Sequence, residues 1–186
     1  MTFPKDKAVT AHFTGHRPQH IGRLHLEVRE CVEWLVEYAT ERGIKVFVSG
    51  MACGVDLTAA KYVMDLIDGG ADLYLVGAVP FPTHWQKWPR STQDEYAALV
   101  KRMKRSDRCK VCLVSDGGYS IEKLTRRNEW MADRASMCLG VYLGTHGRQG
   151  GTYRQLQYSS SRGLHTIYCD PANLRMYQVL PHQEVG

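Results

Sequence analysis

Three glycine-containing segments, each following an apolar run, have residue types suited to binding an anion. They span residues 14–18, 49–61 and 147–152. Glycine lets backbone N–H groups approach a ligand, and an arginine such as Arg17 can form paired hydrogen bonds with a phosphate or carboxylate. A helix beginning after such a turn points further N–H groups and a partial positive charge at the ligand. A single glycine turn can serve only to connect a strand to a helix. Three such turns together favour a phosphate-bearing ligand.

The second segment contains an acid, Asp56, whose carboxylate would repel a phosphate. Two roles remain open for it. It could cap the helix that begins there, or it could accept a hydrogen bond from a ribose hydroxyl, as acids do in dinucleotide-binding folds.

A helix expected over residues 121–135 places an amide at a position where its apolar periodicity predicts an apolar side chain. The inward stripe is Ile121, Leu124, Asn128, Met131 and Ala135. A buried asparagine must be hydrogen-bonded. Asn128 therefore either bonds a neighbouring loop within the core or faces a ligand cleft, with Arg127 and Trp130 beside it. Arg126 and Glu129 are expected on the solvent side.

Aromatic residues follow another apolar run, where Phe81 stands between two prolines and leads to Trp85 and Trp88. Aromatic side chains at the end of a strand could stack on a base. They could equally form a packed cover over a loop.

Alternating strands and helices must position these segments. Apolar runs, expected as strands, occur at 9–13, 46–48, 73–79, 111–114, 139–143 and 166–168. Helical patterns lie between them, at 28–39, 54–67, 92–104, 121–135 and 151–161. Continuously apolar strands indicate a sheet covered on both faces. The sequence therefore predicts an α/β fold, a single Rossmann-like doubly wound domain with a mainly parallel sheet, in which ligands bind beyond the carboxyl ends of the strands.

The expected domain spans residues 1–186, with its core at about 8–170 and a loose tail from about 175 to 186. Hydrophobic residues make up 44% and charged residues 23%, which is ordinary for a globular protein. There is no apolar run long enough to cross a membrane and no secretory signal. Six scattered cysteines fit a reducing compartment, so we expect a cytoplasmic protein without disulfides.

A net charge of +5 tolerates an anionic ligand but falls short of a dedicated nucleic-acid domain. The densest basic cluster lies within residues 101–110; it is either a solvated helix end or a nucleic-acid contact. A small nucleotide is the favoured partner over nucleic acid and membrane. A homodimer is compatible with the fold, although the sequence shows no interface signature.

Metal and common cofactor motifs are not expected. Four histidines, the first of them His12, are spaced as on a helix, but they overlap an expected strand and Pro18. Cys109 and Cys112 lie three apart on a strand, where they face opposite sides, and are expected as core thiols. The P-loop, the dehydrogenase glycine motif and the hydrolase nucleophile motif are also missing.

Taken in order, these motifs resemble the YpsA-like branch of the SLOG superfamily over residues 9–168. The matching segments are 14–18, 49–56, 80–81, 127–133 and 150–152. The resemblance implies a Rossmann-like fold that binds nucleotides or derivatives such as ADP-ribose or NAD-related molecules. Relatives include the LOG phosphoribohydrolases and the DNA-processing protein DprA, so an enzyme or a single-strand DNA binder is an alternative to a sensor or sequestering module.

One departure weakens the expectation of LOG-type hydrolysis. The LOG motif has a glutamate where alignment on Gly151 and Thr152 places Gln155, and a neutral amide cannot act as a general base. Asp133 and Glu129, besides Asp56, remain candidate catalytic acids. The expected ligand-binding residues are Gly15, His16, Arg17, Ser49, Gly50, Met51, Ala52, Gly54, Val55, Asp56, Phe81, Asn128, Gly150, Gly151 and Thr152. No cofactor is expected other than this nucleotide-type ligand.

Overall fold

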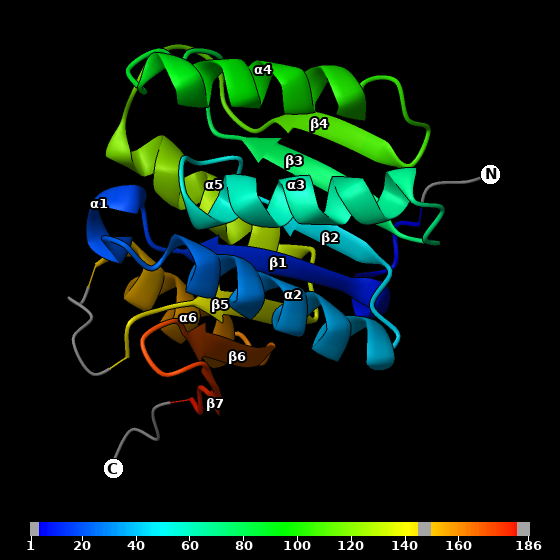
Figure 1. Ribbon diagram of the computed structural model, residues 1–186, viewed down its shortest axis with the longest axis vertical. Coiled ribbons are helices and arrows are strands. Elements are labelled where there is room, and N and C mark those ends of the chain that lie inside the picture. Colours follow the sequence, from blue (N-terminus) through cyan, green and yellow to red (C-terminus); the bar gives the residue numbers. More distant parts are fainter. Residues whose placement is uncertain (1–3, 145–149, 182–186) are drawn as a thin grey trace.

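A seven-stranded sheet lies between two layers of helices in the computed structural model, which describes residues 4–144 and 150–181 (Figure 1). The strands are β1 (Thr10–Gly15), β2 (Val46–Ser49), β3 (Tyr74–Val79), β4 (Cys109–Leu113), β5 (Met137–Val141), β6 (His165–Asp170) and β7 (Arg175–Gln178). Their order is β4-β3-β2-β1-β5-β6-β7, and all neighbouring pairs are parallel except β6 and β7. The predicted α/β fold class is confirmed.

The helices follow the strands in alternation. They are α1 (Pro18–Ile21), α2 (His25–Glu41), α3 (Val55–Asp68), α4 (Arg90–Met103), α5 (Ile121–Asp133) and α6 (Gly151–Ser161), preceded by the short 3-10 helix η1 (Lys7–Val9). The helix α5 begins at a serine, Ser120, whose hydroxyl accepts a hydrogen bond from the Lys123 N–H. Such a cap satisfies one of the N–H groups that a helix start leaves unpaired.

Both faces of the sheet are buried because successive strand residues point to opposite sides. On β2, Phe47 packs into the cluster formed with α2, α3 and α4. Its neighbours Val46 and Val48 pack against Met131 of α5 on the other face. A third cluster joins Leu156 of α6 to β5. This burial on both faces explains why apolar residues occupy consecutive positions along the inner strands.

The order of the strands reverses around β1. The chain runs outward from β1 through β2, β3 and β4, and then returns to place β5 on the other side of β1. In doubly wound sheets the loops on either side of such a reversal separate and leave a crevice at the carboxyl ends of the strands. That crevice is where the fold positions its candidate site.

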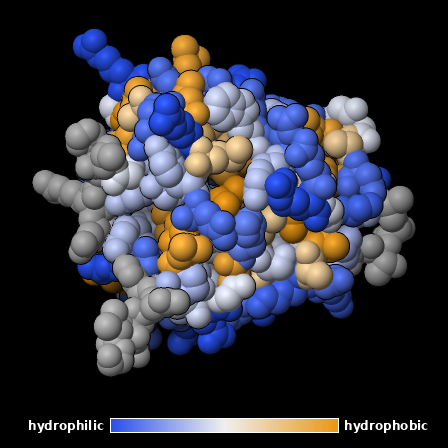
Figure 2. Space-filling view, turned by 90° about the horizontal axis from the view of Figure 1, so that it is seen from below, coloured by the Kyte–Doolittle hydropathy of each residue, from blue (hydrophilic) through white to orange (hydrophobic). Residues whose placement is uncertain are grey.

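The prediction of a loose tail from about residue 175 was wrong for β7. This strand pairs antiparallel with β6, and Tyr177 stacks on Tyr168 with ring centroids 5.1 Å apart. All four residues of β7 are exposed, so the segment lacks the apolar run that marks the other strands. Figure 2 views the molecule from this end of the sheet, where hydrophilic residues surround smaller hydrophobic groups. Residues 182–186 of the expected tail lie outside the described residues.

Cys109 and Cys112 pack on opposite faces of the sheet, as the strand spacing predicts. All six cysteines are free thiols. Within residues 4–144 and 150–181, no group of histidine, cysteine and acidic side chains is arranged to hold a metal ion. In that same part of the chain, every helix is too short or too polar to cross a membrane.

Candidate functional site

A cavity of about 800 Å³ lies where the strand order reverses. Four parts of the fold contribute to its wall: the end of β1, the turn before α3, the inner side of α5 and the start of α6. The lining residues include Thr14, Gly15, His16, Arg17, Ala52, Cys53, Asp56, Leu124, Arg127, Asn128, Met131, Leu143, Gly150, Gly151 and Thr152. Its volume is in the range that holds a ligand of nucleotide size.

Two helices start at this cavity. Gly54 is the N-cap of α3 and Gly150 is the N-cap of α6, and neither helix start has a side-chain cap. Ala52 and Cys53 bring the first of these turns to the cavity wall, and Gly151 brings the second. Each helix start carries a partial positive charge, so the two together favour an anionic ligand. At α3, two of the first N–H groups are already used, because Val55 and Leu57 donate to the carbonyl oxygens of His16 and Ala52.

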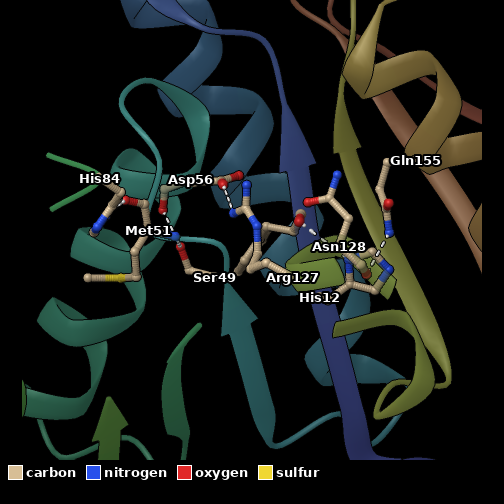
Figure 3. Close-up of polar contacts among 9 residues, drawn as sticks. His12, Ser49, Met51, Asp56, His84, Arg127, Asn128 and Gln155 are labelled. Carbon is tan, nitrogen blue, oxygen red and sulfur yellow. Dashed lines mark hydrogen bonds and ion pairs between the residues drawn. The ribbon is translucent and has the colours of Figure 1, made fainter. Parts of the chain in front are cut away.

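A buried ion pair connects α5 to the first turn of α3. The Arg127 Nη1 atom donates to the Asp56 Oδ2 atom over 3.1 Å, and the two side chains are only 8% and 9% exposed (Figure 3). A side chain at Gly50 would overlap the Arg127 guanidinium and crowd the Asp56 carboxylate. Gly50 is therefore required for this pair to form, a role distinct from the ligand contact expected from the sequence.

Burial shifts the pKa of both partners. It raises the pKa of the Asp56 carboxyl, against the opposing effects of Arg127 and of the Ala52 N–H. It lowers the pKa of Arg127, against the attraction of Asp56. Because each charge is compensated by the other, the cavity wall at this point does not present a free carboxylate to a phosphate.

The structure decides one of the two roles expected for Asp56. The N-cap of α3 is Gly54, so the capping prediction for Asp56 was wrong. Its carboxylate binds Arg127 instead, and the residue lines the cavity. Its recognition of a ribose hydroxyl stays a prediction.

The inner face of α5 differs from the expected stripe. Ile121 is 72% exposed, whereas Arg127 is only 6% exposed and lines the cavity. Asn128 is half-buried and also lines it, which agrees with the cleft-facing alternative. A buried arginine breaks the apolar pattern because Asp56, which lies 71 residues away along the chain, supplies its counter-charge. Hydrophobic periodicity within one helix gives no signal for such a partner.

Two cationic or potentially cationic side chains at the end of β1 face the cavity. Arg17 is exposed, and no ion pair joins it to any residue in the described ranges. The His16 ring is buried, and burial lowers its pKa, which favours the neutral form. Among the described residues, neither His16 Nε2 nor Arg127 Nε has a hydrogen-bond partner. Buried polar atoms without partners are rare, and a bound ligand would satisfy them.

Several residues expected to bind ligand instead build the turn between β2 and α3. The Ser49 hydroxyl donates to the Asp56 carbonyl oxygen over 2.8 Å and accepts the Met51 N–H over 3.1 Å. Met51 is fully buried, with a positive φ of 53°. Val55 packs so closely on Gly15 that a Cβ there would overlap it. None of Ser49, Met51 or Val55 is among the residues that line the cavity.

Gly54 also belongs to the turn. Its φ is 103°, and a Cβ atom there would lie 2.7 Å from the His16 carbonyl oxygen. A bulky substitution would therefore strain the backbone as well as affect a ligand, so Gly54 is a poor probe of binding alone.

Of the residues considered for glycosidic cleavage, all but Asp56 lie outside the cavity wall. Gln155 is buried, and its side-chain Nε2 donates to the Asn128 carbonyl oxygen over 3.2 Å, which fixes the backbone of α5 near the site (Figure 3). Glu129 is exposed, and the exposed Asp133 pairs with Arg162 over 3.3 Å. Among the described residues that line the cavity, Asp56 is the one acid. Residues 147–149 of the third glycine segment lie outside the described residues.

A buried hydrogen-bond chain extends from Gln155 to β1. Gln155 Nε2 lies 3.4 Å from Ser159 Oγ, which in turn lies 3.0 Å from His12 Nε2. The other ring nitrogen of His12 is 3.3 Å from the Phe13 carbonyl oxygen. These contacts suit a neutral ring that donates through Nδ1 and accepts through Nε2. Burial lowers the pKa of His12 to about 4.

We expect the replacement Arg127→Met to cost about 3–5 kcal/mol of unfolding free energy, because it leaves a buried carboxylate without its partner. The double variant Asp56→Asn/Arg127→Met removes both charges and should recover part of that loss. Urea denaturation at pH 7 measures both. A single-variant cost below about 1 kcal/mol would show that the pair is not the stabilising element inferred for it.

The neutral state of His12 predicts a loss of stability in acid. Its folded pKa of about 4 lies below the ordinary value of 6.5, so between these values the unfolded chain binds more protons. The contribution of the neutral His12 ring to the free energy of unfolding is complete above pH 6.5 and is lost as the pH falls toward 4. Removing the titrating ring by His12→Asn should make the fall shallower by up to about 1.4 kcal/mol per pH unit. Urea denaturation between pH 7 and pH 5 checks this, with His25→Asn at an exposed position as control; identical slopes in all three proteins would contradict it.

Comparison with known protein families gave a match that includes the residues of the site. A family model described as the YspA SLOG family matches residues 12–173. A comparison with curated proteins gave no match. The family match covers all the elements that form the cavity, from β1 to the start of α6. The chain therefore belongs to the YspA SLOG family.

Proposed function

We propose that the protein binds a nucleotide or a nucleotide-derived ligand of the ADP-ribose or NAD type, as a sensor or sequestering module. The observation that supports this most strongly is the convergence of two uncapped helix starts and Arg17 on one cavity at the reversal of the strand order. Membership of the SLOG family agrees with a nucleotide-related role.

The phosphates would lie against the turns around Gly15, Ala52 and Gly151, which line the same cavity. There the helix starts supply a partial positive charge, and Arg17 supplies a full positive charge that no ion pair joins to another described residue. Asp56 does not oppose this arrangement, because Arg127 compensates its charge. Asn128, half-buried in the wall, is placed to hydrogen-bond a sugar hydroxyl.

Binding without cleavage is favoured over N-glycosidic hydrolysis. Hydrolysis of the LOG type would need a carboxylate at the cavity that is free to exchange a proton. Asp56 is committed to Arg127, and Gln155, at the position of the LOG glutamate, is an amide bonded to Asn128. Release of a free base from any nucleotide would nevertheless make hydrolysis the activity.

Single-strand DNA binding has weaker support. Two arginines of the basic cluster are already paired, Arg102 with Asp65 and Asp68, and Arg108 with Asp72. The remaining cations at residues 101–105 border a groove of α4 that is distinct from the cavity. A steep fall in DNA affinity with rising salt is required for this alternative.

Calorimetric titration with AMP, ADP-ribose, NAD and cyclic ADP-ribose tests the proposal, followed by chromatography of each mixture. We expect saturable binding with the ligand recovered unchanged. Arg17→Gln should weaken binding of the best ligand by about tenfold or more, because a charge-assisted hydrogen bond contributes about 1.5–3 kcal/mol.

Arg126→Gln is the matched control for Arg17→Gln. This substitution removes the same charge from a side chain that is 63% exposed and does not line the cavity. Equal affinities for Arg17→Gln and the control would contradict the placement of the phosphates. Failure of all four ligands to bind would contradict the proposed function.

A further inference from the structure

A groove along α4, here called the α4 groove, lies apart from the nucleotide site described above. Helix α4 is the outermost helix of the layer that it forms with α2 and α3, next to the edge strand β4 (Figure 1). The groove has a volume of about 540 Å³ and shares no described lining residue with the cavity at the reversal of the strand order. One side of α4 and Trp85, from the loop after β3, form its walls.

The residues that α4 contributes to the groove lie on one stripe of the helix, because positions three and four apart share a helix face. The stripe contains Gln93, Ala97, Val100, Lys101 and Lys104, with Arg105 just beyond the helix end. The neighbouring stripe, which includes Leu99 and Met103, is buried against the sheet. The α4 groove therefore runs along the border between the buried and the exposed sides of the helix.

Stacked aromatic rings form part of the apolar floor of the groove. Trp85 stacks on Tyr96 with ring centroids 6.3 Å apart, and Trp88 meets Tyr96 edge-on at 5.7 Å. Trp85 is half-buried, and it lines the groove together with the exposed Ala97. The two tryptophans thus form the packed cover that was one of the two roles expected for them. Phe81, expected from the sequence to bind the ligand, is 3% exposed and is not among the residues that line the nucleotide cavity.

Three exposed cations border the groove, namely Lys101, Lys104 and Arg105. Within the described ranges, no ion pair joins any of them to an acid, and none of the lining residues is acidic. The two acids of α4 have other partners: Asp94 pairs with Arg90 over 3.2 Å, and Glu95 pairs with Lys61 over 3.0 Å. The groove therefore combines an apolar floor with positive charge that its own acids do not compensate.

This combination suits an acidic segment of another protein better than a membrane or a nucleic acid. A concave apolar surface receives a side chain, whereas a membrane-binding surface inserts apolar side chains of its own. Single-stranded DNA stacks successive bases on free aromatic faces, but Trp85 and Tyr96 already stack on each other. A segment that carries an apolar side chain among carboxylates is complementary to both parts of the groove.

We propose that the α4 groove binds a short acidic segment of a partner protein. An apolar side chain of that segment packs against Trp85 and Val100, and its carboxylates pair with the three cations at the border. The inference does not depend on the nucleotide site, because the two sites share no described lining residue. It gives the basic cluster at residues 101–110 a role different from the two expected from the sequence.

Selection of peptides from a random library displayed on phage, with the full-length protein as bait, tests the inference. We expect the enriched peptides to carry aspartate or glutamate beside leucine or an aromatic residue. Ala97→Gln places a polar side chain in the groove and should weaken binding of the best peptide by about tenfold or more in fluorescence anisotropy. Ala98→Gln is the matched control, because this neighbouring alanine is also exposed but does not line the groove. It should leave the affinity unchanged.

A charge reversal tests the second part of the inference. Lys101→Glu/Lys104→Glu should weaken binding of the same peptide by about tenfold or more at low salt, because it replaces attraction by repulsion at the border of the groove. Lys5→Glu/Lys7→Glu makes the same change in net charge at two exposed residues that do not line the groove, and should have little effect.

Three results would overturn the inference. The first is a selection that enriches no peptide or only peptides without acidic residues. The second is equal affinity of Ala97→Gln and Ala98→Gln for the selected peptide. The third is a dT oligonucleotide, or a vesicle containing phosphatidylglycerol, that binds more tightly than the peptide and is released by the charge reversal at Lys101 and Lys104. Nucleotide titration of the same variants should match the wild type, so a failure of the proposed function would be seen separately.

Discussion

The site depends on the buried ion pair between Arg127 and Asp56. Burying an arginine and a carboxylate costs several kcal/mol for each charge, and only their mutual attraction and further hydrogen bonds offset that cost. The pair joins α5, on one face of the sheet, to the turn that starts α3, on the other face. Gly50 makes room for it. The part of the cavity wall that Asp56 and Arg127 form is therefore fixed by a contact between distant parts of the chain.

Close packing at β1 complements this ion pair. Gly15 has no side chain, which lets Val55 and hence the start of α3 approach the end of the central strand. Strand β5 on the other side of β1 leads through Leu143 toward the start of α6. The fold thus directs two helix starts to one point, and it leaves Arg17 exposed between them. Positive potential at that point is a property of the backbone as much as of side chains.

Local pattern was enough to predict most of the elements. The expected helix at 151–161 matches α6, and the expected helix at 54–67 differs from α3 by one residue at each end. The exposed strand β7 had no apolar run and was missed. The glycine segments indicated the edge of the sheet at which the cavity lies, because parallel strands end on one side. Contacts between distant elements did not follow from pattern. Arg127 pairs with Asp56 of α3, Gln155 donates to the Asn128 carbonyl oxygen of α5, and His84 lies against the Met51 carbonyl oxygen. No period within one helix or loop encodes these three contacts.

Backbone amide chemical shifts recorded during titration with ADP-ribose test the central claim most directly, because they report on each helix start separately. We expect the largest changes at Ala52 and Cys53 before α3 and, at the same ligand concentrations, at Gly151 and Thr152 of α6. These residues line one cavity, so a single phosphate group should affect both segments together. Changes confined to one of the two helix starts, or centred on the groove of α4, would contradict the convergence of both helices on the ligand.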